Sequence, residues 1–485
     1  MPMSRFRGRV LCAATLAALG APAALAADRL ATPEGAQELR DLFARFLPTA
    51  ATSLVTVNPE GAHYLISFDL SALNPLLEAA GAAVSYDPAT LLYRAAEQDD
   101  GKWRVTMDSL PKILTRSEAA TSTVDIANFN ETLLIDPAIA WFVSGSASAD
   151  RGLIKSQEKR NEATIDFGQF RADLSSETIA GGAVSSKGTE QVADIAVKIA
   201  GPGEETTPVN VSGRVDKAEI HVEVEGLKSR KAFELGELLA GHRARSDLAA
   251  HEAELKGLLK ELAAPGLSFG EGLEAQKAVI ESQIGAVAAS DLKYRIGAAN
   301  AGPQSSVNLA VSLEGLSLPA GLAPPGATEL TPSNVDLAAT LKGIDFAAAA
   351  NEAIAVMNLQ GDDPPISDAD SARVMAALLS AGPLRVEFAP SHVRAPAVDA
   401  DFEGVIRYAP GKPTGSMTLR MRGFDKTMAA VKALGPEISG KALPGLAMAK
   451  GLAKSEPDGS LSWIVELGDD RSIKVNGLPL GKAPD

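Results

Sequence analysis

The sequence predicts an α+β fold dominated by an extended or curved, mostly antiparallel β-sheet. Three observations support this prediction. Short segments of alternating apolar and polar residues recur along the chain, Asp-Gly turns join some of them, and several end in Gly or Ser followed at once by a helical segment. With 485 residues, 46% of them hydrophobic, the chain is long enough for about two to four domains and a sizeable core.

The first 26 residues have the features of a secretory signal peptide. Three arginines within the first nine residues form a positive n-region, residues 10–21 form an apolar h-region, and residues 24–26 (Ala-Leu-Ala) supply a small-x-small cleavage site. The alternative, an uncleaved membrane anchor, is weaker because the apolar run is short for a spanning helix. We therefore expect cleavage after Ala26 and export to the periplasm.

Charge and cysteine content narrow the function classes. Cleavage leaves 43 Lys and Arg against 61 Asp and Glu, a net charge of -18. This charge excludes non-specific nucleic-acid binding and disfavours docking of a broad basic surface onto anionic lipid headgroups. The one cysteine, Cys12, lies in the signal peptide, so the mature chain is expected to contain no disulfide, cysteine nucleophile or thiolate metal site. No later segment has 18 uninterrupted apolar residues, so no transmembrane segment is expected.

The first predicted domain, residues 27–226, is rich in β-structure. It opens with an amphipathic helix at 34–50 and a strand at 62–69. Strands at 91–96 and 102–108 flank the turn Asp99-Asp100-Gly101, which is a strong hairpin signal because both turn residues must tolerate positive φ. Further strands are expected at 121–129, 131–136, 163–167, 171–175, 191–199, 208–215 and 217–225.

Residues 227–290 are predicted to form a helical insertion. Residues 231–262 are rich in Ala, Leu, Glu and Lys, and Glu252 and Lys256 form an i, i+4 pair. Pro265-Gly266 interrupts this pattern, and 272–289 is predicted as a second helix, so that the insertion would be a helical hairpin.

The second β-rich domain is expected over residues 291–485. A hairpin is predicted where Pro457-Asp458-Gly459 precedes a strand at 461–467. The other strands are expected at 291–297, 306–313, 333–341, 384–388, 399–408 and 415–421. Loops dense in Pro, Gly or acidic residues are expected at 201–208, 319–332 and 361–368.

A loose repeat runs through these predictions, in which an alternating strand ends in Gly or Ser and a helical run follows. Gly226, Gly315, Gly343 and Gly423 occupy the same place in four copies, where a positive φ can turn the chain off a strand. The irregular spacing excludes a regular solenoid, and either duplication or the common occurrence of this unit in α+β proteins explains it. The copies lie at 63–81, 103–114, 219–239, 335–357 and 417–435, with 306–321 beginning in the same way before Pro319 stops the helix.

No metal-ligating pattern is evident among the five histidines. His63 and His221 fall in expected strands and His392 in an expected loop. His242 and His251 are nine residues apart, so on one straight helix they would face opposite sides. The absence of HExxH, HxH and EF-hand spacings leads us to expect no metal site and no cofactor.

Two weak motifs remain. Gly266-Leu267-Ser268-Phe269-Gly270 matches G-x-S-x-G and His392 lies downstream, but a nucleophile elbow needs a preceding strand, and a helix end and Pro265 precede this one. Acidic pairs lie in turns, where solvated Asp is normal, although a weak divalent-cation site is the alternative. These pairs are Asp99-Asp100, Asp362-Asp363 and Asp469-Asp470. We expect no catalytic residues.

The signal peptide, the Cys-free acidic mature chain, the strand-Gly-helix units and the ending RSIKVNGLPLG (471–481) resemble the alphaproteobacterial DUF2125 proteins. These are uncharacterised envelope proteins without an assigned activity. More widely, the pattern is similar to AsmA-like and YdgA-like periplasmic proteins. The resemblance covers most of residues 28–485 and carries over no catalytic residue. It implies a long curved sheet with one apolar face.

Three hypotheses follow. The first is a non-enzymatic envelope protein whose sheet binds a lipid or another apolar ligand or protein partner. The second is a secreted serine hydrolase that uses Ser268 or an acidic pair, and the third is a purely structural envelope component. Under the first hypothesis, apolar strand residues line either the core or a groove, with the core favoured: Leu65, Ile66, Phe68, Val222, Val224, Leu309 and Val311.

Overall fold

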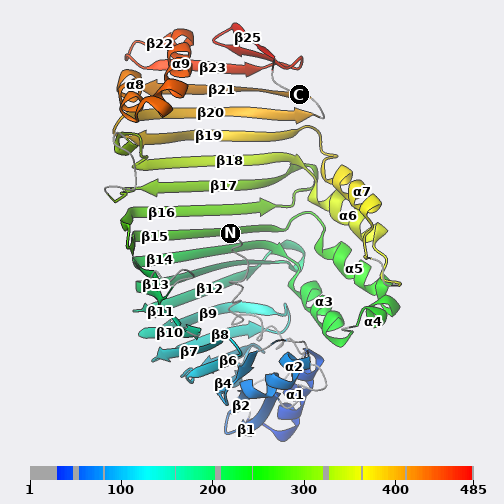
Figure 1. Ribbon diagram of the computed structural model, residues 1–485. Helices are drawn as coiled ribbons and strands as arrows, with labels where there is room; N and C mark the ends of the chain where they lie inside the picture. The colour runs from blue at the N-terminus through cyan, green and yellow to red at the C-terminus, as the bar shows by residue number, and fades with distance from the viewer. Residues whose placement is uncertain are drawn as a thin grey trace.

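A single antiparallel sheet dominates the computed structural model. Within the described residues, 25 strands join this sheet and the helices lie along its margins (Figure 1). The predicted α+β class with a mostly antiparallel sheet is confirmed. The predicted signal peptide lies outside the described residues, which are 30–46, 54–79, 82, 84–158, 160–202, 209–242, 244–319, 327–361, 364–409 and 412–482.

The N-terminal strands form two columns that meet at one long strand, β13. One column runs β1–β2–β4–β5–β8–β9–β12 and pairs with the first half of β13. The other runs β3–β6–β7–β10–β11 and pairs with its second half. The bounds are β1 Val55–Glu60, β2 His63–Asp69, β3 Val84–Tyr86, β4 Thr90–Glu97, β5 Trp103–Met107, β6 Ile113–Ser117, β7 Ala120–Ala127, β8 Asn130–Asp136, β9 Trp141–Ala149, β10 Arg151–Glu158, β11 Asn161–Phe167, β12 Phe170–Thr178 and β13 Val184–Gly201.

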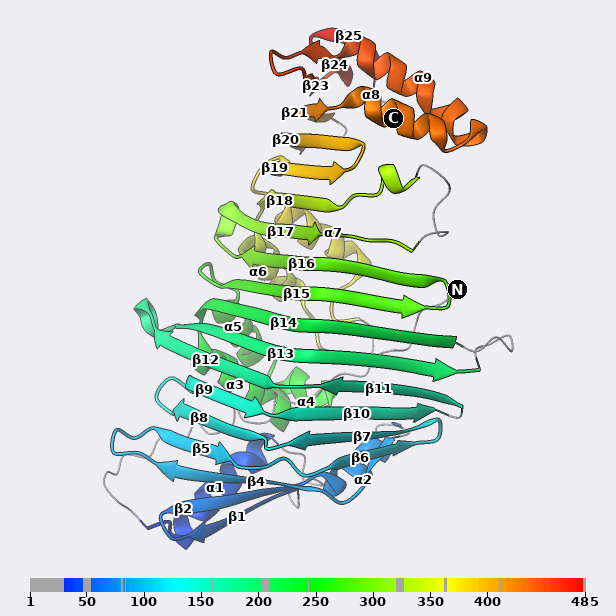
Figure 2. The same ribbon diagram turned by 90° about the vertical axis from the view of Figure 1, so that its left-hand side faces the viewer.

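From β13 onward the sheet is a single column (Figure 2). Each strand pairs with the next as far as β21, which pairs with β23, and β24 and β25 follow. The short β22 lies beside β23. The bounds are β14 Val209–Leu227, β15 Ser268–Ser282, β16 Gly285–Ala299, β17 Ser305–Glu314, β18 Asn334–Ile344, β19 Leu384–Ala395, β20 Val398–Ala409, β21 Lys412–Arg422, β22 Lys454–Ser455, β23 Leu461–Leu467, β24 Ser472–Val475 and β25 Leu478–Lys482.

The longest strands contain residues in the left-handed conformation. Asp194 in β13 has φ 53° and Lys277 in β15 has φ 50°. The pairing register with the neighbouring strands continues unchanged across both residues. In β13 the apolar residues nevertheless change from even positions at Val184 and Val192 to odd positions from Ile195.

The same shift explains a wrong prediction. Residues 272–289 belong to β15 and β16 and not to a helix. The apolar residues Leu273 and Ala275 precede Lys277, whereas Ala278 and Ile280 follow it, so their spacing is no longer the uniform two of a strand. Glu, Ala, Gln and Lys in this segment also favour helices by intrinsic propensity, and sheet pairing overrides that preference.

The first part of the predicted insertion is helical. Helices α3 (Ser229–Gly241), α4 (Arg245–Ala250) and α5 (Glu252–Leu262) connect β14 to β15, which are neighbours in the sheet. With α6 (Phe346–Val356) and α7 (Asp368–Leu378), they form a row beyond one end of the central strands (Figure 1). The proposed division into two β-rich domains and an insertion stays a prediction.

The strand-Gly-helix units are largely confirmed. Gly226 and Gly343 are the second-last residues of β14 and β18, and Gly423 follows β21. They precede α3, α6 and α8 (Phe424–Ala433), and their φ angles are 77°, 83° and 65°. Gly315 has φ 63°, and no helix begins in the described residues 316–319 that follow it, as Pro319 led us to expect. At Gly343 a Cβ would lie 2.3 Å from the carbonyl oxygen of Pro383, so a side chain there is excluded twice, by conformation and by space.

Other copies and strands differ from the prediction. The copy at 63–81 is confirmed, because β2 leads into a short 3-10 turn and α2 (Asn74–Ala79). The copy at 103–114 is wrong, because β6 and not a helix follows β5. Strands β9 and β10 were not predicted, since Ser, Ala and Gly dilute the apolar alternation of 141–158.

Two hydrophobic cores lie at the two ends of the sheet. Helix α1 (Pro33–Phe46) packs onto the first strands, where Val57 and Ile66 are fully buried. At the other end α8 and α9 (Pro436–Leu452) pack onto β20, β21, β23 and β24, around Trp463 and Phe424, whose ring centroids are 5.7 Å apart. A smaller cluster, Leu238, Leu255, Leu258 and Leu359, holds the helical row together.

Candidate functional site

One face of the sheet carries apolar rows that cross many strands. The Phe269 row joins Val224, Phe269, Ala298, Val307, Leu341, Val386 and Ile406, each paired with the next across neighbouring strands. A second row, the Leu309 row, lies two residues further along each strand and joins Val222, Glu271, Ile296, Leu309, Ala339 and Phe388. We call this side of the sheet the apolar face.

The apolar face is continuous with both cores. Toward the N-terminus the Leu309 row continues through Leu174, Gly145 and Leu133 to Val105, which is buried under α1. A third row runs from Val192 through Ala218, Ala275, Leu292, Leu313, Val335, Val393 and Ala400 to Met421, which is buried under the C-terminal helices. Helices therefore cover the two ends of one apolar surface.

Between the two ends, large apolar side chains of this face reach solvent. Phe269 is 43% exposed, Leu309 45% and Leu337 38%. Ile280, in the second half of β15, is 56% exposed. Monomeric proteins rarely expose a contiguous apolar surface of this kind, and such surfaces commonly mark ligand or partner sites.

The opposite face of the same strands is polar. Cross-strand ion pairs cover it, among them Lys342–Glu387 at 2.6 Å and Lys293–Glu274 at 3.6 Å. The hydrogen bond from the Lys342 ammonium lowers the pKa of the Glu387 carboxyl. The Thr340 hydroxyl donates a hydrogen bond of 2.8 Å to Asn308 Oδ1. The sheet is therefore amphipathic, and we call this side the polar face.

Carboxylates interrupt the apolar face, and three of them bear on its function. Glu190 and Glu271 are exposed, whereas Glu131 is half-buried between Met107 and Ala147 on the neighbouring strands. Burial raises the pKa of Glu131. No described side chain forms an ion pair with Glu131, so its charged form is desolvated without compensation.

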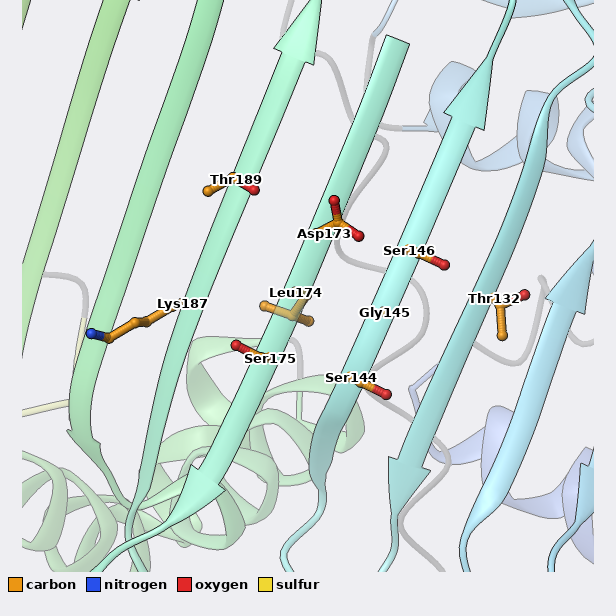
Figure 3. A pocket seen from close by; sticks show the side chains of 9 residues that line it. All are labelled: Thr132, Ser144, Gly145, Ser146, Asp173, Leu174, Ser175, Lys187 and Thr189. Atoms are coloured by element: carbon orange, nitrogen blue, oxygen red, sulfur yellow. The ribbon is translucent and has the colours of Figure 1, made fainter.

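A shallow hollow of about 450 Å³ lies over β8, β9, β12 and β13 (Figure 3). Thr132, Ser146, Asp173 and Thr189 form one cross-strand row in it, which continues to His221 of the polar face. Its lining is mostly hydroxyl groups with one Asp and one Lys, and no aromatic ring provides a stacking surface. Nothing in this lining favours a specific ligand.

The residues of the hydrolase hypothesis are not assembled into a site. Ser268 is the first residue of β15, where it pairs with Glu225 and Ala299, and it does not stand on a strand-to-helix turn. No hydrogen bond joins Ser268 to a histidine within the described residues. The prediction that His392 lies in a loop is wrong, because His392 belongs to β19 and its Nε2 lies 2.7 Å from Asn334 Oδ1.

The structure brings two histidines together that the sequence separates. His242 ends α3 and His251 lies between α4 and α5, and their rings stack with centroids 3.8 Å apart. The expectation of opposite sides is wrong because the helix is broken between them. His63 and His221 lie in strands as predicted, beside Glu60 and Glu219.

The acidic pairs remain ordinary turn residues where they are described. Asp100 accepts a hydrogen bond from the backbone of Lys102, and Asp470 accepts one from Ser472. Asp362 and Asp363 lie outside the described residues. In the part of the chain that the structure describes, no three His, Cys, Asp or Glu side chains are grouped to hold a metal ion.

Sequence reasoning identified only part of the apolar face. Val222, Val224, Leu309 and Val311 lie on it, whereas Ile66 and Phe68 belong to the N-terminal core. Leu65 points to the other side of its strand from Ile66. Phe269 and Leu273 were missed because their segment has a helical composition. Continued alternation on both sides of Lys277 was the signal that could have found them.

Comparison of the chain with protein-family models, curated proteins and solved structures finds no match. The resemblance to the DUF2125 proteins therefore stays a prediction. Among the described helices, none is both long and apolar enough to cross a membrane.

Proposed function

We propose that the protein is a non-enzymatic component of the periplasm that holds the hydrocarbon chains of a lipid on its apolar face. The observation that carries this proposal is the exposure of Phe269, Leu309 and Leu337 on rows that run between the two cores, where none of the described helices covers them. Strands are about 4.8 Å apart, so the eight intervals from β9 to β19 span roughly 38 Å. A hydrocarbon chain of matching length fits along these rows.

The carboxylates of the face favour a thin ligand over a second protein sheet. Two sheets packed face to face would bury Glu190 and Glu271 without partners, at a cost of several kcal/mol each. A hydrocarbon chain that lies along the Phe269 row, which contains no carboxylate, leaves these side chains in water. At about 0.8 kcal/mol for each buried methylene, ten methylenes contribute about 8 kcal/mol before the entropic cost of binding.

The test compares two double variants of the same two strands. Leu309→Gln with Leu337→Gln places polar groups on the apolar face, whereas Asn308→Gln with Thr340→Gln changes the polar face and serves as the control. Native mass spectrometry after incubation with an envelope lipid extract, and titration with a fluorescent fatty acid, measure binding. We expect the first variant to lose at least tenfold in affinity and the control to keep it.

Two results would contradict the proposal. One is the absence of any lipid adduct on the parent protein together with no fatty-acid binding. The other is equal affinity of the two double variants, which would place the ligand away from this face. Thermal unfolding of both variants checks that each keeps the fold, as expected for substitutions outside the two buried cores.

A further inference from the structure

The C-terminal end of the sheet differs in charge from the rest of the molecule. Residues 412–482 contain eleven Lys and Arg against seven Asp and Glu, a net charge of +4 in a chain whose total is -15. Five lysines of this end form no salt bridge within the described residues: Lys426, Lys432, Lys441, Lys474 and Lys482. At the opposite end, residues 30–69 contain two Arg and five Asp or Glu.

Exposed apolar side chains gather on the two outermost elements of the same end. Ile438 and Met448 of α9 are 46% and 62% exposed. Leu478 and Leu480 of β25, the last strand of the sheet, are 53% and 47% exposed. Helix α9 and β25 lie together at the tip of the molecule in both orientations (Figures 1 and 2). The tip thus combines apolar side chains with lysines that form no salt bridge within the described residues.

We infer that this tip docks onto an anionic lipid bilayer, with the long axis of the sheet pointing away from it. Interfacial binding needs apolar side chains that enter the headgroup boundary and cations that attract anionic lipids. The remainder of the chain, with its net charge of -19, is repelled by the same surface. Attraction at one end and repulsion elsewhere orient the molecule end-on.

The net charge of the whole chain disfavours docking through a broad basic surface. The contact inferred here is different, because it uses only the basic C-terminal end. It also stands apart from the proposed lipid-binding face. The docking residues lie on α8, α9, β24 and β25, whereas Phe269 and Leu309 lie on central strands. Either proposal can fail while the other holds.

The experiment is flotation of the purified protein with vesicles, in low and high salt. One set contains phosphatidylethanolamine with phosphatidylglycerol and the other contains phosphatidylcholine alone. We expect binding to the anionic set only, weakened by salt. Exchange of Lys426, Lys432 and Lys441 for Gln is expected to weaken binding at least tenfold, and so is Met448→Gln.

The matched control exchanges three lysines of the central strands, Lys155, Lys187 and Lys198, for Gln and is expected to bind like the parent. Leu309→Gln with Leu337→Gln should also bind vesicles normally, which separates this test from that of the lipid-binding face. The inference is overturned if the parent protein does not float with anionic vesicles, if it binds neutral vesicles equally, or if both lysine variants lose the same affinity.

Discussion

Asn476 donates a hydrogen bond of 2.8 Å from its side-chain amide to the backbone carbonyl of Leu452, the last residue of α9. The same amide donates to the Ser462 carbonyl at 3.0 Å, and its oxygen accepts from the backbone N–H of Ile464 at 2.8 Å. One side chain therefore ties the turn between β24 and β25 to β23 and to the end of α9. This link holds the C-terminal helices on the apolar face.

We expect Asn476→Gly to weaken the attachment of α9 to the C-terminal strands. Asn476 has φ 50°, which Gly adopts freely, so this substitution removes the three side-chain bonds without straining the backbone. The expected loss is about 2 to 3 kcal/mol of local stability. Hydrogen exchange of the α9 amides measures it.

The matched control is Asn128→Gly. Asn128 has φ 52° and makes one exposed side-chain bond, to Asp150. Loss of this hydrogen bond is expected to lower the free energy of unfolding by less than about 1 kcal/mol. Equal protection of α9 in Asn476→Gly and in the parent protein would show that packing alone holds the helix.

Gly343→Ala is expected to destabilise the unit in which β18 leads into α6. The added Cβ would lie 2.3 Å from the Pro383 carbonyl oxygen, on a residue whose φ is 83°. We expect a loss of more than about 2 kcal/mol, against about 1 to 2 kcal/mol for Gly459→Ala, where φ is 80° but no atom lies within 4 Å. Urea unfolding measures the free energy of unfolding of both variants. Equal losses of stability in the two would mean that β18 and β19 move apart at Gly343 without an energetic cost.

Glu131→Gln is expected to stabilise the protein at neutral pH. Burial raises the pKa of Glu131, so its contribution to stability is complete below the ordinary value of 4.5 and is lost as the pH rises through the higher pKa of the folded state. Gln at this position cannot ionise, so the variant does not lose this stability as the pH rises. The free energy of unfolding should therefore rise at pH 7 and converge with that of the parent protein below the ordinary pKa.

Glu190→Gln, an exposed change on the same face, is the control and is expected to stay within about 0.5 kcal/mol at both pH values. Chemical unfolding measures the free energy of unfolding of each variant at pH 7 and at acid pH. A Glu131→Gln protein that is less stable than the parent at pH 7 would mean that the carboxylate has a partner in solution.

Local signals explain which parts of the fold could be predicted. The turn at Asp99-Asp100-Gly101 needs a positive φ, and Gly101 has φ 77°. Residues 272–289 were assigned to helices because one left-handed residue, Lys277, breaks the strand pattern and pairing partners decide the outcome. Local sequence alone does not contain that information.

The exposure of the apolar face could not be predicted from local sequence, for a different reason. Val105 and Leu309 stand in one cross-strand row, and each lies in a strand of alternating apolar residues. Val105 is 1% exposed because α1 lies over it, and Leu309 is 45% exposed because no described helix does. Burial on a long sheet depends on helices that are distant in the sequence.

The most direct test of the central claim is single-cysteine labelling with and without lipid. In a Cys12→Ala background the chain has no other cysteine, so Leu309→Cys, Asn308→Cys and Ala95→Cys each report on one position. Without lipid, Leu309→Cys should react about as fast as Asn308→Cys on the polar face and far faster than Ala95→Cys, which is buried in the N-terminal core. Added fatty acid should slow Leu309→Cys alone. A Leu309→Cys protein that is as protected as Ala95→Cys without lipid, or that fatty acid leaves unchanged, would contradict the claim.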